Sequence, residues 1–143
     1  MSERSKVVKF SDYRWQDVPL EDYKPGATHF KDVTRQTLLG EGSGEEVLHF
    51  VTRYFEIQPG GYSTLERHEH PHSVVVLRGR GSVLLGDEAY DLRPYDCVYC
   101  APRSAHQFRA ASDQPLGFLC IVDRIRDRPE VFDRASGEWI TRG

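Results

Sequence analysis

Between residues 47 and 122 the chain alternates short apolar segments with clusters of glycine, proline and aspartate. The segments are rich in β-branched and aromatic residues, which strands prefer, and they recur about every 8–12 residues. No helical period of comparable length competes with them. This pattern is typical of a sandwich or barrel, so we predict an all-β fold. The expected strands cover residues 47–57, 74–77, 82–85, 90–92, 97–100, 106–109 and 116–122, and Pro59-Gly60-Gly61 is expected to end the first of them.

The 143 residues fit a single folding unit with flanking segments. We expect an irregular N-terminal arm over residues 1–33, a β-barrel domain over residues 34–124 and a C-terminal surface extension over residues 125–143. The arm is aromatic and is expected to pack across the barrel or onto a second subunit. A homodimer is therefore expected. The aromatic residues of the arm are Tyr13, Trp15, Tyr23 and Phe30.

Charge and composition argue against several classes of partner. The net charge is −3 and no run of five like charges occurs, whereas nucleic-acid binding needs clustered basic residues. No apolar stretch is long enough to cross a membrane, and the N-terminus leads into no apolar signal segment. The three cysteines are an odd number and disfavour a disulfide scaffold, so Cys97, Cys100 and Cys120 are interpreted as small core residues. A cytoplasmic location is expected.

The most chemically suggestive segment is His-rich: of six histidines, three lie between positions 68 and 72. Residues two apart on a strand face the same side, so Glu66, His68, His70 and His72 would share one face. Imidazoles are costly to bury without a partner, and neutral imidazole is a common metal ligand. His106 begins a distant strand and would supply one further ligand. The alternative is a solvated loop whose histidines bind nothing.

The same segment resembles the first motif of the cupin family, which reads Gly, five residues, His-x-His, three or four residues, Glu, six residues, Gly. Here Gly60 is followed by five residues, Glu66-x-His68, three residues, His72, six residues and Gly79. The second cupin motif reads Gly, five residues, Pro-x-Gly, two residues, His, three residues, Asn. His106 aligns with its histidine, although Tyr95, Ala101, Arg103 and Ala110 replace the usual Gly, Pro, Gly and Asn. The resemblance implies a double-stranded β-helix, or jelly-roll, barrel.

The resemblance also implies a ligand set of three histidines and one glutamate around one divalent transition metal. The ungapped alignment gives Glu66, His68, His72 and His106, with the carboxylate moved from third to first place. A gapped alignment uses His70 in place of Glu66. Iron, manganese, nickel, copper and zinc all suit such ligands, whereas calcium and magnesium prefer oxygen.

Cupins of this single-domain type include enzymes of several classes and binding proteins, so the fold does not decide the activity. The first expectation is an iron- or manganese-type dioxygenase acting on a small organic substrate. The alternatives are an isomerase or lyase acting on a sugar or carboxylic acid, and a non-catalytic binder of a small ligand. Candidate substrate-binding residues on the strands are Arg53, Tyr99 and Gln107.

Overall fold

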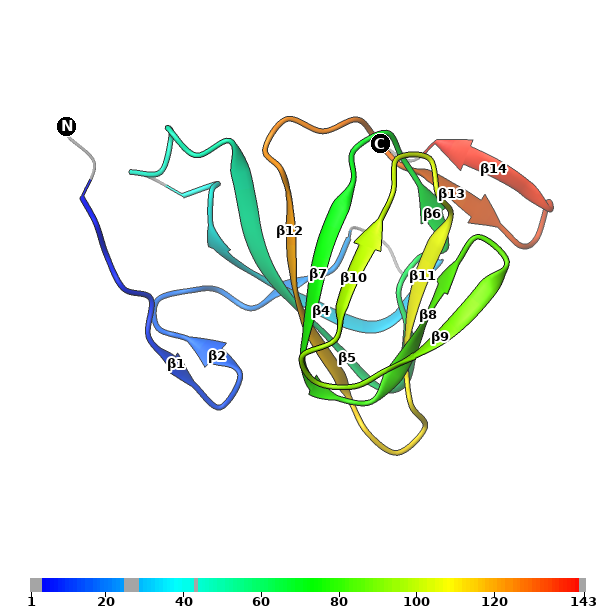
Figure 1. The fold of residues 1–143 in the computed structure, drawn as a ribbon, viewed down its shortest axis with the longest axis horizontal. Coiled ribbons are helices and arrows are strands. Elements are labelled where there is room, and N and C mark those ends of the chain that lie inside the picture. Colours follow the sequence, from blue (N-terminus) through cyan, green and yellow to red (C-terminus); the bar gives the residue numbers. More distant parts are fainter. Residues whose placement is uncertain (1–3, 25–28, 43, 142–143) are drawn as a thin grey trace.

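The computed structural model describes residues 4–24, 29–42 and 44–141, and within them it contains fourteen β-strands and no helix (Figure 1). The all-β prediction is confirmed. No helix capable of crossing a membrane occurs in these ranges. The strands are β1 Phe10–Ser11, β2 Arg14–Trp15, β3 Glu21–Asp22, β4 Lys31–Leu39, β5 Phe50–Tyr62, β6 Glu66–Arg67, β7 His72–Gly79, β8 Gly81–Leu85, β9 Glu88–Leu92, β10 Cys97–Cys100, β11 His106–Ala110, β12 Leu116–Asp123, β13 Glu130–Asp133 and β14 Glu138–Thr141.

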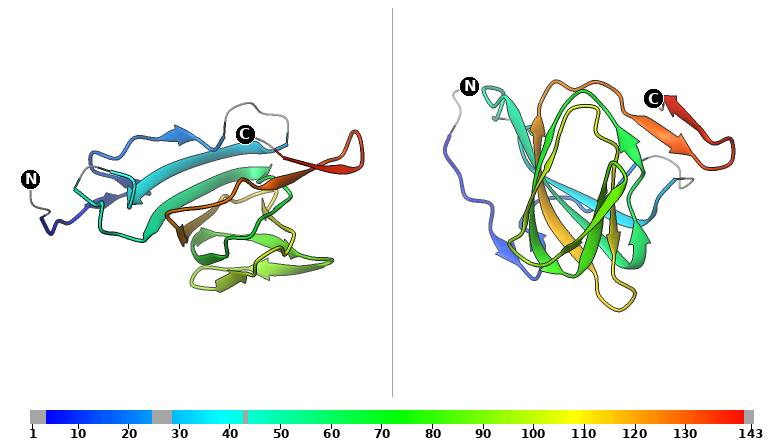
Figure 2. Two further views of the ribbon diagram at one scale, coloured as in Figure 1. Left: turned by 90° about the horizontal axis from the view of Figure 1, so that it is seen from above. Right: turned by 45° about the vertical axis from the view of Figure 1, so that its right-hand side comes forward.

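The strands form two antiparallel layers. One layer has the order β10-β7-β12-β5-β4-β3, and the other has the order β9-β8-β11-β6-β13-β14. The left view of Figure 2 shows β8 and β9, in yellow-green, below the long strands β4 and β5. Strand β5 belongs to both layers, because it pairs with β12 over its first half, with β4 from Thr52 to Tyr62, and with β11 at Tyr62.

The passage of β5 between the layers occurs at Pro59-Gly60-Gly61. The prediction that these residues end the strand is wrong, since β5 continues to Tyr62. Gly60 has a φ of 78°, which glycine adopts without strain, and its amide donates to the backbone oxygen of Ala111 at 2.9 Å. The glycines therefore bend the strand and keep it hydrogen-bonded.

The core lies between the two layers. Phe118 stacks on Phe108 with ring centroids 4.6 Å apart and lies 5.7 Å from Phe55. Cys100 and Cys120 are buried among these side chains, whereas Cys97 is exposed. The alternation of a strand explains the difference, because residues three apart point to opposite faces.

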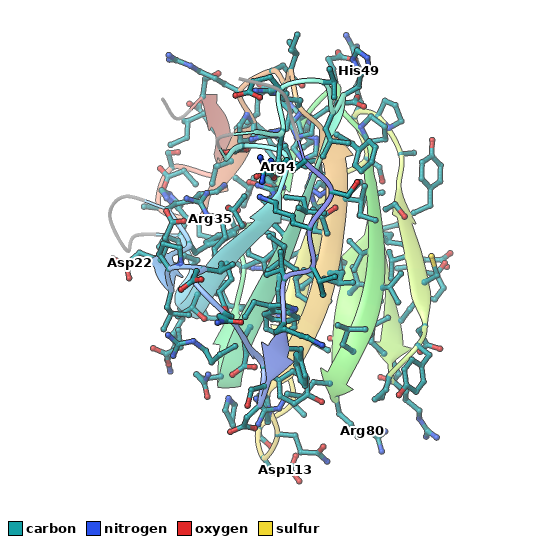
Figure 3. The ribbon with its side chains drawn as sticks, turned by 90° about the vertical axis from the view of Figure 1, so that its left-hand side faces the viewer. Arg4, Asp22, Arg35, His49, Arg80 and Asp113 are labelled. Carbon is teal, nitrogen blue, oxygen red and sulfur yellow. The ribbon has the colours of Figure 1, made fainter. Side chains whose placement is uncertain are left out.

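The N-terminal arm crosses the outer face of the first layer (Figure 3). Tyr13 stacks on Tyr54 of β5 and Trp15 packs against it at a tilt, with ring centroids 6.1 and 4.9 Å away. Further along, Tyr23 is buried against Phe30 and Phe55. The aromatic residues that suggested a dimer interface are thus packed within their own chain.

The C-terminal residues form the hairpin β13–β14, which extends the second layer (Figure 2). Strand β13 pairs with β6, with Val131 opposite Glu66 and Glu130 opposite Arg67. Val131 is buried. The hairpin therefore fixes the short strand that leads into the His-rich segment.

Candidate metal centre

Three histidines from separate strands meet at one end of the barrel. His68 follows β6, His72 begins β7 and His106 begins β11. One nitrogen of each lies within 4.8 Å of the other two, and Nε2 of His68 is 3.0 Å from Nε2 of His72. Nitrogens that share a metal at about 2.0–2.1 Å are about this far apart. The spacing therefore fits a common metal ion.

The second ring nitrogen of each histidine has a partner of its own. Nδ1 of His68 lies 2.6 Å from the backbone oxygen of His70, and Nδ1 of His106 lies 3.0 Å from that of Ser104. A carbonyl oxygen only accepts, so both Nδ1 atoms donate, and it is Nε2 of each ring that presents a lone pair to a metal when the ring is neutral. Nδ1 of His72 lies 2.9 Å from Sγ of Cys120. The rings are held with Nε2 directed toward the shared point.

The protonation of His72 suits metal binding. Burial lowers the pKa of this imidazole to about 2, and the neighbouring His106 and His68 act in the same direction. The ring is therefore neutral at physiological pH, and neutral imidazole is the form that binds metals.

One carboxylate oxygen of Glu66 faces the histidines, and the other accepts hydrogen bonds. Oε1 lies 3.7 Å from Nε2 of both His68 and His106, while Oε2 accepts hydrogen bonds from Nζ of Lys24 and, at 2.8 Å, from Oγ1 of Thr64. Burial raises the pKa of Glu66, but the facing imidazoles and Lys24 outweigh it and hold the pKa well below its usual value. The site thus offers three imidazoles and one ionised carboxylate, which fits a divalent transition metal.

His70 lies beside the three histidines and not among their convergent nitrogens. Its ring stacks on His68 with centroids 3.7 Å apart, and its Nδ1 lies 2.7 Å from Oδ1 of Asp127. Asp127 also accepts the backbone amides of Glu69 and His70, at 2.8 and 3.0 Å. This carboxylate therefore fixes the loop between β6 and β7, a role that the sequence around Asp127 does not indicate.

A cavity of about 170 Å³ lies next to the histidines. Phe55, Phe108 and Phe118 form an apolar part of its wall, and Cys120 also lines it. The cavity is large enough for a small organic molecule, and its polar groups converge at the histidines.

Of the three substrate-binding candidates, only Arg53 lines this cavity. Gln107 is buried, and its amide donates to the backbone oxygen of Ser63 at 2.9 Å. Tyr99 is 67% exposed because its neighbours Val98 and Cys100 occupy the inward positions of β10. Gln107 and Tyr99 are not among the residues that line this cavity, and their role in substrate binding stays a prediction.

Sequence reasoning missed four residues that support the site: Tyr23, Lys24, Thr64 and Asp127. The hydroxyls of Tyr23 and Thr64 lie 3.0 Å apart, and Thr64 in turn binds Glu66. Of these residues, Thr64 alone had a possible signal, because it precedes Glu66 by two positions and so faces the same side of an extended segment.

Comparison with known proteins identifies the family. The model described as "Cupin domain" matches residues 53–122. A protein from Rhodospirillum rubrum named 1-methylthio-D-xylulose 5-phosphate methylsulfurylase is 48% identical over 123 residues, which cover 85% of this chain and 76% of the relative. The chain belongs to the cupin family.

Solved cupin structures superpose closely on this cupin. A cupin-2 domain from Rhodospirillum rubrum has a TM-score of 0.78 and 45% identity, covering 92% of this chain and 86% of that structure. A cupin 2 conserved barrel domain protein from Rhodopseudomonas palustris has a TM-score of 0.81 and 41% identity, covering 92% and 88%. The cupin fold expected from the two motifs is confirmed.

Proposed function

We propose that this cupin is a metal-dependent enzyme that removes the methylthio group from 1-methylthio-D-xylulose 5-phosphate or a close analogue. The identity of 48% to a relative named for this activity carries the proposal. The convergent Nε2 atoms of His68, His72 and His106 support it, because they provide a metal site beside a cavity lined by polar and aromatic side chains.

His68, His72 and His106 would hold the metal, with Oε1 of Glu66 as the fourth ligand. The proposed substrate is a ketose with sulfur on the carbon next to its carbonyl group. Removal of the group needs an acceptor, and an added thiol would bond to the methylthio sulfur as the carbon–sulfur bond breaks, while the electron pair of that bond and then a proton pass to the carbon. A bound metal would supply a Lewis acid at the carbonyl group, which favours the electron pair on that carbon. His70 would stay outside the ligand set, as the ungapped alignment predicts.

The residues of the chain would orient the substrate and exclude water. The rings of Phe55, Phe108 and Phe118 suit a methylthio group, since thioether sulfur packs favourably against aromatic rings. Lys24 and Thr64 keep Glu66 ionised and turned toward the histidines, so that its Oε1 can join their nitrogens at the metal.

The proposal selects among the activities expected from the sequence. Removal of a methylthio group from a sugar phosphate is closer to the lyase alternative than to the dioxygenase. The two differ in their need for oxygen, because cleavage of the carbon–sulfur bond by polarisation of a carbonyl group consumes none.

The decisive experiment measures release of the methylthio group from 1-methylthio-D-xylulose 5-phosphate under anaerobic conditions with a thiol added as its acceptor, the protein being loaded in turn with iron, manganese, nickel, copper and zinc. We expect turnover with at least one metal and its loss in His106→Ala. His49→Ala is the matched control, because it also removes an imidazole and His49 is not among the residues that line the cavity.

Two outcomes would overturn this function. Turnover that requires oxygen would favour the dioxygenase activity instead. Tight binding of the substrate without turnover under any metal would favour the non-catalytic binder.

The division of the chain at residues 33 and 124, a homodimer and a cytoplasmic location also stay proposals. Because the arm aromatics pack within the chain, a dimer would have to use another surface. Light scattering tests it directly: twice the mass of one chain supports a dimer, and the mass of one chain contradicts it.

A further inference from the structure

Two arginines line the cavity from adjacent strands. Arg35 lies on β4 and Arg53 on β5. In the register of these strands Arg35 is opposite Phe55, so Arg53 is its diagonal neighbour on the same face. Diagonal neighbours are about 7–8 Å apart at the backbone, within reach of two long side chains that bind one group.

Both guanidinium groups have a donor without an acceptor. Nε of Arg35 and Nε of Arg53 are buried, and neither has a hydrogen-bond partner within the described part of the chain. A buried donor on a charged group is costly to leave unsatisfied. A ligand that supplies acceptor oxygens to the cavity would remove this cost.

The charge of Arg53 is also uncompensated. Its Nη2 lies 3.7 Å from Sγ of Cys120, and its guanidinium lies 5.0 Å from the Phe55 ring centroid. No carboxylate of residues 4–24, 29–42 or 44–141 forms an ion pair with it. Arg35 pairs with Glu21 at 3.2 Å, where both side chains are partly exposed. The wall of the cavity therefore carries a positive charge that a bound anion would neutralise.

The other cations of the wall are engaged. Lys24 is bound by Glu66, and Arg126 is bound by Glu41 and by the backbone oxygen of Asp123. Arg35 and Arg53 are thus the groups best placed to meet an incoming charge.

We propose that Arg35 and Arg53 form a binding site for the phosphate group of the substrate and select phosphorylated ligands. The planar guanidinium fork donates two parallel hydrogen bonds to phosphate oxygens, a geometry that lysine does not reproduce. Arg53 is joined to the histidines through Cys120, which contacts both Arg53 and His72. A phosphate on Arg53 would therefore lie a short carbon chain away from a group bound at the histidines. The inference rests on the proposed function for the identity of the substrate and not for the anion site itself.

The first test measures binding of inorganic phosphate to the metal-free protein by isothermal titration calorimetry, so that no metal can bind the anion. We expect Arg53→Gln and Arg35→Gln each to weaken binding about tenfold to a hundredfold. Arg53→Lys keeps the charge and should recover only part of the loss. Arg80→Gln is the matched control, since Arg80 is exposed between β7 and β8 at the lower end of the sheet (Figure 3).

The second test compares 1-methylthio-D-xylulose 5-phosphate with its unphosphorylated analogue on the metal-loaded enzyme. In Arg53→Gln we expect a KM about tenfold or more higher for the phosphorylated substrate and a smaller change for the analogue, so that the preference for the phosphorylated substrate falls. Circular dichroism on each variant verifies that it is folded. If Arg53→Gln does not fold, Arg53→Lys and Arg35→Gln still decide the question.

The outcomes separate the two proposals. If phosphate binding is unchanged in both arginine variants, or falls equally in Arg80→Gln, the phosphate site is wrong. If the arginine variants lose phosphate binding while the wild-type protein turns over neither substrate with any metal, the phosphate site stands and the proposed activity fails.

Discussion

The orientation of the three imidazoles depends on three different contacts. His68 and His106 each donate to a nearby backbone oxygen, and His72 contacts the thiol of Cys120. These partners fix the rings before any ion arrives, which reduces the cost of ordering the ligands. His70 has its equivalent nitrogen engaged by Asp127 and stacks on His68, so it supports the site from outside.

The first prediction separates ligands from neighbours. We expect His106→Ala to lower bound metal to well below one ion per chain, because it removes one of three convergent nitrogens. His70→Ala should retain the metal with at most about a tenfold loss in affinity. Elemental mass spectrometry of the purified proteins measures both. Full metal content in His106→Ala, or an equal loss in the two variants, would contradict the assignment.

The second prediction concerns pH. Partial desolvation raises the pKa of Asp127, but hydrogen bonds from the amides of Glu69 and His70 and from the His70 ring outweigh it and hold the pKa well below its usual value. Because the folded-state pKa is depressed, the ionised carboxylate stabilises the fold fully above the unfolded-state pKa of about 4. This stabilisation is lost as the pH falls toward the folded-state value.

Asp127→Asn should therefore melt below the wild-type protein at pH 7, and the difference should shrink below about pH 4. Melting followed by circular dichroism between pH 3 and pH 8 measures it. Asp113→Asn provides the control, because Asp113 lies on an exposed loop at the lower end of the molecule (Figure 3). If the difference in melting temperature stayed constant across this pH range, the ionised carboxylate would not be the source of the stability.

The resemblance to the cupin motif placed Glu66, His68, His72 and His106 in one candidate set, because Gly60 and Gly79 fix the register of that alignment, whereas spacing alone also included His70. Lys24 and Asp127 could not be found in this way. Lys24 is 42 positions from Glu66, and Asp127 is 57 positions from His70. Contacts at such separations depend on how the arm and the segment after β12 fold back, and no local pattern encodes that.

At the scale of elements, the path of β5 is the feature that local reasoning could not supply. Pro59-Gly60-Gly61 ends strands in most sequences, yet here the chain bends and pairs with β11. Hydrogen bonds to the second layer outweigh the local preference for a turn. The strands from β7 to β12 were predicted well because turn residues separate them clearly.

The third prediction compares the two motif glycines. Both have positive φ, 78° at Gly60 and 79° at Gly79. A Cβ at Gly60 would meet no atom within 4 Å, whereas one at Gly79 would lie 1.6 Å from the backbone oxygen of Pro115. Gly60→Ala should therefore cost only backbone strain, about 1–2 kcal/mol. Gly79→Ala adds a clash and should cost about 4–5 kcal/mol.

Urea denaturation of the two glycine variants measures the free energy of unfolding. Equal losses would mean that β7 and the loop before β12 move apart easily at Gly79. The structure would then be looser at that junction than the close approach to Pro115 indicates.

Across the whole molecule, the site draws on every part of the chain. The histidines come from the barrel, Lys24 comes from the arm, and Asp127 and β13 follow the last barrel strand. The arm and the C-terminal segment are therefore parts of the candidate site and not accessories to it.

The fourth prediction tests this at the arm. Lys24→Met removes the cation that binds Glu66, so we expect metal affinity to fall about tenfold as the carboxylate loses its orientation. Lys6→Met is the matched control. Lys6 lies in another part of the arm, and its partner is Glu45. Metal titration by calorimetry distinguishes them. Unchanged metal affinity in Lys24→Met would mean that the arm does not contribute to metal binding.

The contact between Lys24 and Glu66 links two equilibria: docking of the arm and occupation of the site by an ion. Such coupling is reciprocal, so the factor by which a docked arm tightens metal binding equals the factor by which the ion favours docking. Without the ion, the arm would open more often and expose its backbone to proteases. The lifetime of the protein in a cell would then follow the supply of its metal.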